Sequence, residues 1–60
     1  MLTPDDLAEL RNILKQAETL VVNVRDAYAR DGRIGAARLL GEVTLALQDE
    51  IDAIEKELAE

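Results

Sequence analysis

Apolar residues in two stretches of the chain follow a seven-residue rhythm that predicts two long helices. In the first stretch the steps alternate between three and four without a break, at Leu7, Leu10, Leu14, Ala17, Val21, Val24 and Tyr28. The second stretch repeats this spacing, at Ala37, Leu40, Thr44, Leu47, Ile51, Ile54 and Leu58. Such spacing lines residues along one side of a helix that packs lengthwise against another. We therefore expect helices over about residues 4–30 and 34–59.

The short segment from Arg30 to Arg33 separates the two patterns. Gly32 suits the left-handed residue that ends many helices. A connection of about three residues forces the second helix back alongside the first. Facing positions then have numbers that add up to about 65, and the apolar layers of the two stretches match in register. The sequence thus predicts an all-α antiparallel two-helix hairpin that forms a single domain over residues 1–60.

The segment Thr3-Pro4-Asp5-Asp6 predicts where the first helix begins. The Thr3 hydroxyl can cap free backbone N–H groups, and Pro4 fits the first helical position. Asp6 stands where the acid of a capping box belongs, three residues after the threonine.

Both predicted helices carry more apolar side chains than one hairpin can cover. The uncovered residues are Ile13, Leu20, Val22, Leu39, Val43, Leu45 and Ala46. So large an apolar surface on a small chain indicates an interface, and twofold dimers are the commonest assemblies. We expect these residues to form a homodimer interface in a four-helix bundle with coiled-coil-like packing. The apolar residues that follow the seven-residue spacing form the predicted seam between the two helices. Thr44 is a polar residue in this seam. It either fixes the register of helix packing or donates a hydrogen bond to the preceding turn of its own helix.

Charge is distributed unevenly along the chain, which has a net charge of −6. Residues 25–38 contain two acids and four arginines and carry +2; the arginines are Arg25, Arg30, Arg33 and Arg38. Residues 39–60 contain seven acids and one lysine and carry −6, and residues 1–24 carry −2. Residues 25–38 surround the loop and form the basic corner of the hairpin. Two subunits packed antiparallel would place the basic corner of each beside the acidic chain ends of the other subunit. Charge therefore favours an antiparallel dimer, with the ion pairs selecting orientation more than adding stability.

Side chains suited to catalysis or metal binding are scarce. The chain has no Cys, His or Ser, so it lacks the common metal ligands and the usual general base near neutral pH. The order Asp31-Gly32-x-Ile34 resembles the middle of a calcium-binding loop, but three ligand positions would be Ala27, Ala29 and Arg38. Carboxylates of the second stretch lack the histidines of bundle metal sites and are expected to form a solvated face. We expect no catalytic residue, no metal and no cofactor.

These observations predict a non-enzymatic protein that acts as a small protein–protein interaction module, adaptor or regulator. The four corner arginines are expected to be solvated, to form interchain ion pairs or to bind an acidic protein partner. One alternative is a regulator that binds nucleic acid through this corner, since helical-hairpin dimers of the plasmid ROP type bind RNA. Another is a structural subunit of a larger assembly, for example one that is phage- or plasmid-borne. The negative charge and the single aromatic residue disfavour nucleic acid.

The first residues lack the pattern of a secretory leader, and residues 34–47 are too short and too charged to span a bilayer. We therefore expect no membrane association and a cytoplasmic location.

Overall fold

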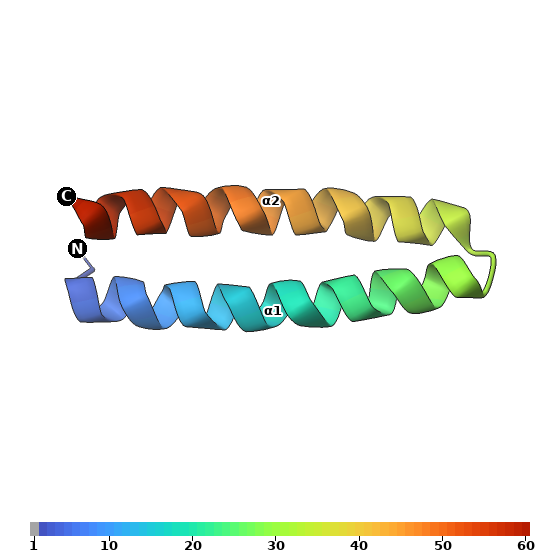
Figure 1. Ribbon diagram of the computed structural model, residues 1–60, viewed down its shortest axis with the longest axis horizontal. Helices are drawn as coiled ribbons and strands as arrows, with labels where there is room; N and C mark the ends of the chain where they lie inside the picture. The colour runs from blue at the N-terminus through green and yellow to red at the C-terminus, as the bar shows by residue number, and fades with distance from the viewer. Residues whose placement is uncertain (1) are drawn as a thin grey trace.

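The computed structural model describes residues 2–60 as two antiparallel helices joined by a short loop (Figure 1). Helix α1 spans Pro4–Arg30 and helix α2 spans Ile34–Ala59. The two helices form a rod of 43 × 16 × 14 Å, with the start of α1 and the end of α2 at one end and the loop at the other. The expected helical hairpin and the expected bounds of both helices are confirmed.

Helix α1 begins with the capping box that the sequence predicts. The Asp6 backbone amide donates to the Thr3 hydroxyl at 3.1 Å, and the Thr3 amide donates back to the Asp6 carboxylate at 3.2 Å. Two N–H groups that the helix leaves without partners are thereby satisfied.

The loop ends α1 with a Schellman motif. The Arg33 amide donates to the Tyr28 carbonyl at 2.9 Å, and the Gly32 amide donates to the Ala29 carbonyl at 3.1 Å. Gly32 has φ of +79°, a conformation that costs a residue with a Cβ atom about 1–2 kcal/mol. This glycine allows the chain to reverse within three residues and sets α2 against α1.

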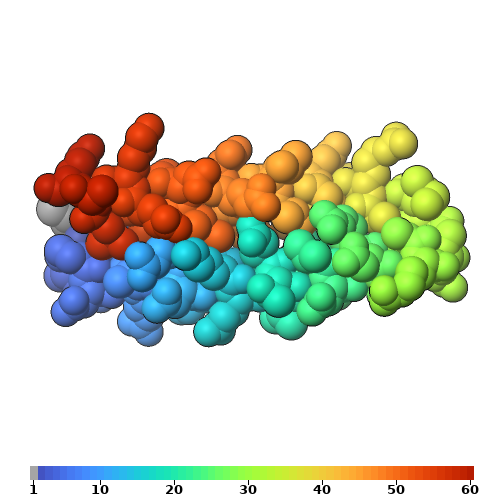
Figure 2. All heavy atoms as spheres, in the orientation of Figure 1, coloured from blue at the N-terminus to red at the C-terminus, as the bar shows by residue number. Residues whose placement is uncertain are grey.

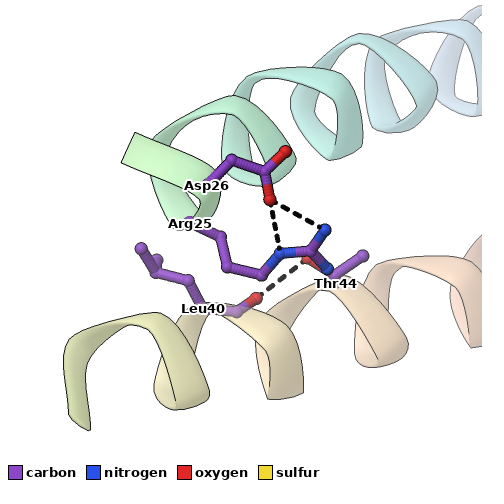
Figure 3. A network of polar contacts seen from close by, with 4 residues as sticks. All are labelled: Arg25, Asp26, Leu40 and Thr44. Atoms are coloured by element: carbon purple, nitrogen blue, oxygen red, sulfur yellow. Dashed lines mark hydrogen bonds and ion pairs between the residues drawn. The ribbon is translucent and has the colours of Figure 1, made fainter. Parts of the chain in front are cut away.

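Helix α2 presents the predicted seam to α1. Thr44, Ile51 and Ile54 are buried, and the other seam residues are half-buried. The Thr44 hydroxyl donates to the Leu40 carbonyl at 2.9 Å (Figure 3). Of the two roles expected for Thr44, the bond to its own helix is the one observed.

Helix α1 is rotated about its own axis relative to the expected packing, so that a different set of its residues faces α2. The residues of α1 that are half-buried along its contact with α2 include Leu7, Arg11, Leu14, Glu18, Val21 and Arg25. Three residues expected in that contact are exposed instead, by 36% at Leu10, 46% at Val24 and 36% at Tyr28. The expectation that these three are buried against α2 is therefore wrong.

Long polar side chains make this rotation possible, because their aliphatic stems can cover apolar surface while their charged ends reach water. The Arg25 side chain extends from α1 toward α2 and pairs with Asp26 on its own helix (Figure 3). A Cβ atom at Gly41 would lie 3.9 Å from Cδ of Arg25. The space beside Gly41 thus lies next to the stem of Arg25.

The interior of the hairpin is small. Within residues 2–60, Ile51 and Ile54 are the two apolar residues that are buried, although side chains close most of the space between the helices (Figure 2). The chain exposes 4587 Å², whereas a compact globular protein of its mass exposes about 3,900 Å². One hairpin therefore leaves an excess of exposed surface.

Candidate interaction surface

One side of the hairpin carries two rows of apolar residues, which together we call the apolar face. On α1 its residues are three or four positions apart and follow the length of the helix: Leu10, Ile13, Ala17, Leu20, Val24 and Tyr28. On α2 it comprises Leu39, Val43 and Ala46. Each residue advances about 100° around its helix, so that each row lies to one side of its helix's contact with the other. Because the two helices run in opposite directions, the two rows lie on the same side of the hairpin.

The opposite side, which we call the polar face, carries the ion pair between the helices. Lys15 Nζ lies 3.4 Å from Glu55 Oε1, and helical spacing places both residues on the side away from the apolar face. A shallow hollow of about 430 Å³ also lies on the polar face; its lining residues are Lys15, Glu18, Thr19, Gln48, Ile51 and Asp52. The two sides of the hairpin thus differ chemically.

The structure brings together five of the seven residues predicted to form the interface. Ile13, Leu20, Leu39, Val43 and Ala46 lie exposed on the apolar face. The other two do not join them, since Val22 is half-buried toward the polar face and Leu45, 62% exposed, projects from that side. The predicted set is therefore divided between two surfaces.

Leu10, Val24 and Tyr28 belong to the apolar face but are absent from the predicted interface. Their seven-residue rhythm assigned them to the contact with α2. The width of the apolar stripe on α1, about three positions in seven, was the signal that another edge of the stripe could face α2. The sequence therefore identified the stripe but not its rotation.

The four corner arginines do not converge on one site. Arg25 pairs with Asp26 at 3.2 Å, and Arg33 pairs with Asp31 at 2.9 Å. Arg30 and Arg38 are exposed, and their helical positions direct them away from the apolar face.

Arg33 alone of these arginines borders the corner end of the apolar face. It lines a hollow of about 590 Å³, which is open to solvent. The remaining lining residues are Asn23, Val24, Ala27, Tyr28 and Asp31. A mainly apolar hollow with a cation at its edge therefore marks this end.

The other end of the apolar face is acidic on α2. Glu50 and Glu57 continue the row of Leu39 and Val43 toward the end of the helix. Glu50 lies near the middle of the hairpin, level with about residue 15 of α1, and Glu57 lies near the chain ends. The apolar face therefore has a positive group at the corner and a negative group near the chain ends.

Neither a metal site nor a membrane span is found among residues 2–60. No group of three or more acidic, histidine or cysteine side chains in this range could hold a metal ion. Neither helix here combines the length and the apolar character that crossing a membrane requires. Comparison with protein-family models, with curated protein sequences and with solved structures finds no match.

Proposed function

We propose that this chain is a non-enzymatic, self-associating helical hairpin that acts as a small protein–protein interaction module, adaptor or regulator. Two such hairpins join through their apolar faces into a four-helix bundle. The bundle presents the polar faces and the outer helix surfaces to partners. Cofactors and metals have no part in this proposal.

The observation that carries the proposal is the contrast between the buried interior and the apolar face. Two apolar residues are buried within residues 2–60, while Leu20 and Leu39 on the apolar face are 65% and 63% exposed. The exposed surface exceeds that of a compact protein of this mass by about 700 Å². A standard protein–protein interface removes about 800 Å² from each partner. A second hairpin is therefore of the right size to cover the excess.

Light scattering across a dilution series tests the self-association. We expect a mass of twice the 6.6 kDa of one chain at micromolar concentration and above. A folded chain that keeps the mass of a monomer throughout the series would contradict the proposal. A tetramer would indicate that the polar face also takes part in assembly.

The same sample also discriminates the nucleic-acid alternative. Two of the corner arginines have acidic partners within their own subunit, and the chain carries a net charge of −6. We therefore expect no retention on RNA or DNA at low salt. Retention that falls steeply as salt is added would favour a regulator that binds nucleic acid through the corner.

A further inference from the structure

We infer that a second copy of this chain covers the apolar face with its own α1 antiparallel to the first α1, and that the twofold axis passes beside Ala17. This arrangement rests on the self-association proposed above and specifies its geometry. Helix α1 forms the centre of the dimer interface with its partner's α1, and α2 contacts the partner's α2.

The row of α1 on the apolar face is self-complementary from Leu10 to Val24. In two antiparallel helices, facing positions have numbers with a constant sum. With Ala17 opposite itself, Leu10 faces the partner's Val24, and Ile13 faces the turn that holds the partner's Leu20. From Leu10 to Val24 the row therefore matches its own reverse, with large residues opposite large residues and the small Ala17 at the centre. Tyr28 extends beyond this part of the row, to the level of the partner's Asp6. A twofold interface requires such self-complementarity.

Rotation of α1 within the hairpin is what makes this row available. Leu10 and Val24, which form one of these pairs, are 36% and 46% exposed. The buried contact with α2 uses a different edge of the stripe, at Leu14 and Val21 among others. One wide apolar stripe thus serves two helix contacts, as the helices of a four-helix bundle require.

Charge favours the same orientation. The antiparallel arrangement places the corner of each subunit, with Arg33 beside the apolar hollow, at the end that holds the partner's Glu57 and Glu60. A parallel arrangement would place the two basic corners together and the two acidic ends together. Repulsion between like charges thus disfavours the parallel dimer.

Helix α2 has a consistent place in this geometry. Ala17 lies level with about position 48 of α2, because facing positions within the hairpin add up to about 65. Val43 then faces the partner's Ala53. Ala46 and Leu39 face the turns that contain the partner's Glu50 and Glu57 respectively. The methylene groups of a glutamate can cover a leucine while its carboxylate stays in water.

Cysteine cross-linking tests the position of the axis directly, because the natural chain contains no cysteine. The variant Ala17→Cys should form a covalent dimer on mild oxidation or with a short bis-maleimide. The matched control is Thr19→Cys, two residues away and exposed on the polar face. We expect Thr19→Cys to cross-link at least about tenfold more slowly, since its thiols lie on opposite outer sides of the bundle. Circular dichroism under reducing conditions checks that both variants fold.

A mixture of two variants reports the competing arrangement. In a parallel dimer α1 faces the partner's α2, so Val24→Cys mixed with Val43→Cys would cross-link between the two kinds of subunit. That result, with no cross-link from Ala17→Cys in a protein of dimer mass, would overturn the antiparallel geometry and leave the proposed self-association intact. A monomer by light scattering would overturn both. Rapid cross-linking of Ala17→Cys alone is the result that supports the inference.

Discussion

Replacing Leu20 with glutamate is expected to break the proposed dimer, while the same change at Leu45 leaves it intact. The two leucines are almost equally exposed in one hairpin, at 65% and 62%. Leu20 lies on the apolar face, near the proposed twofold axis, and Leu45 projects toward the polar side. Any difference in dimer stability between the two variants therefore depends on which face carries the leucine. It does not depend on the exposure or the chemistry of the side chain.

The size of the effect follows from the burial of Leu20 in each of the two subunits. Burying a leucine side chain contributes about 1.5–3 kcal/mol, and both copies lose it in the variant. A glutamate in the same position must also give up water without gaining a partner. We expect the dissociation constant to rise at least about 100-fold, which corresponds to about 2.7 kcal/mol.

Sedimentation equilibrium of Leu20→Glu and Leu45→Glu at matched concentrations measures this difference. Equal weakening by both substitutions would show that the two faces contribute alike. Strong weakening by Leu45→Glu alone would transfer the interface to the polar side. Either result would contradict the assignment of the apolar face.

Replacing Ile54, one of the two buried apolar residues, with alanine is expected to lower the stability of the folded chain strongly. Ile54 is 7% exposed, and truncating a buried isoleucine to alanine typically costs 2–5 kcal/mol, so we expect about that loss. In a domain of this size each kcal/mol lowers the melting temperature by about 4–8 °C. The melting temperature of Ile54→Ala should therefore fall by at least about 8 °C.

Ile34→Ala provides the matched control, because it removes the same atoms from a side chain that is 57% exposed. Its cost should stay within about 0.5 kcal/mol, as for most surface substitutions. Thermal unfolding followed by circular dichroism at one fixed chain concentration compares the two variants. Similar losses from both would mean that burial within the hairpin does not identify the residues that stabilise it.

Local signals in the sequence were sufficient to predict the hairpin and the bounds of its helices. Thr3 and Asp6 specify the start of α1, and Gly32 supplies the positive φ that ends it. Each of these roles depends on neighbours within a few residues. Spacing within each stretch then predicts two helices, and the short loop makes them antiparallel.

The rotation of α1 could not be predicted in the same way. Its apolar stripe is wide enough for two contacts, and the rhythm of Leu10, Val24 and Tyr28 does not say which contact they make. The choice depends on how the stems of Arg11 and Arg25 fit against α2, which is a matter of packing. Residues outside the seven-residue apolar pattern, such as Arg11 and Arg25, therefore occupy part of the contact between the helices. Apolar residues of that pattern, such as Leu10 and Val24, remain exposed.

The candidate interface was predicted in part for the same reason. Ile13, Leu20, Leu39, Val43 and Ala46 share a face because helical spacing alone relates them. Val22 and Leu45 were grouped with them because they lie outside the seam, a criterion that does not distinguish one side of the hairpin from the other. The direction of each helix and its rotation are needed to separate the two sides.

The proposed hairpin needs a second copy of the chain to cover its apolar face, so its melting temperature should depend on chain concentration. If folding and association are coupled, higher concentration stabilises the folded dimer by mass action. Over about a hundredfold range of concentration, the melting temperature of the unmodified chain should rise by several degrees, with one cooperative transition at each concentration. A melting temperature that stays constant over this range, in a chain that light scattering identifies as a monomer, would contradict the claim.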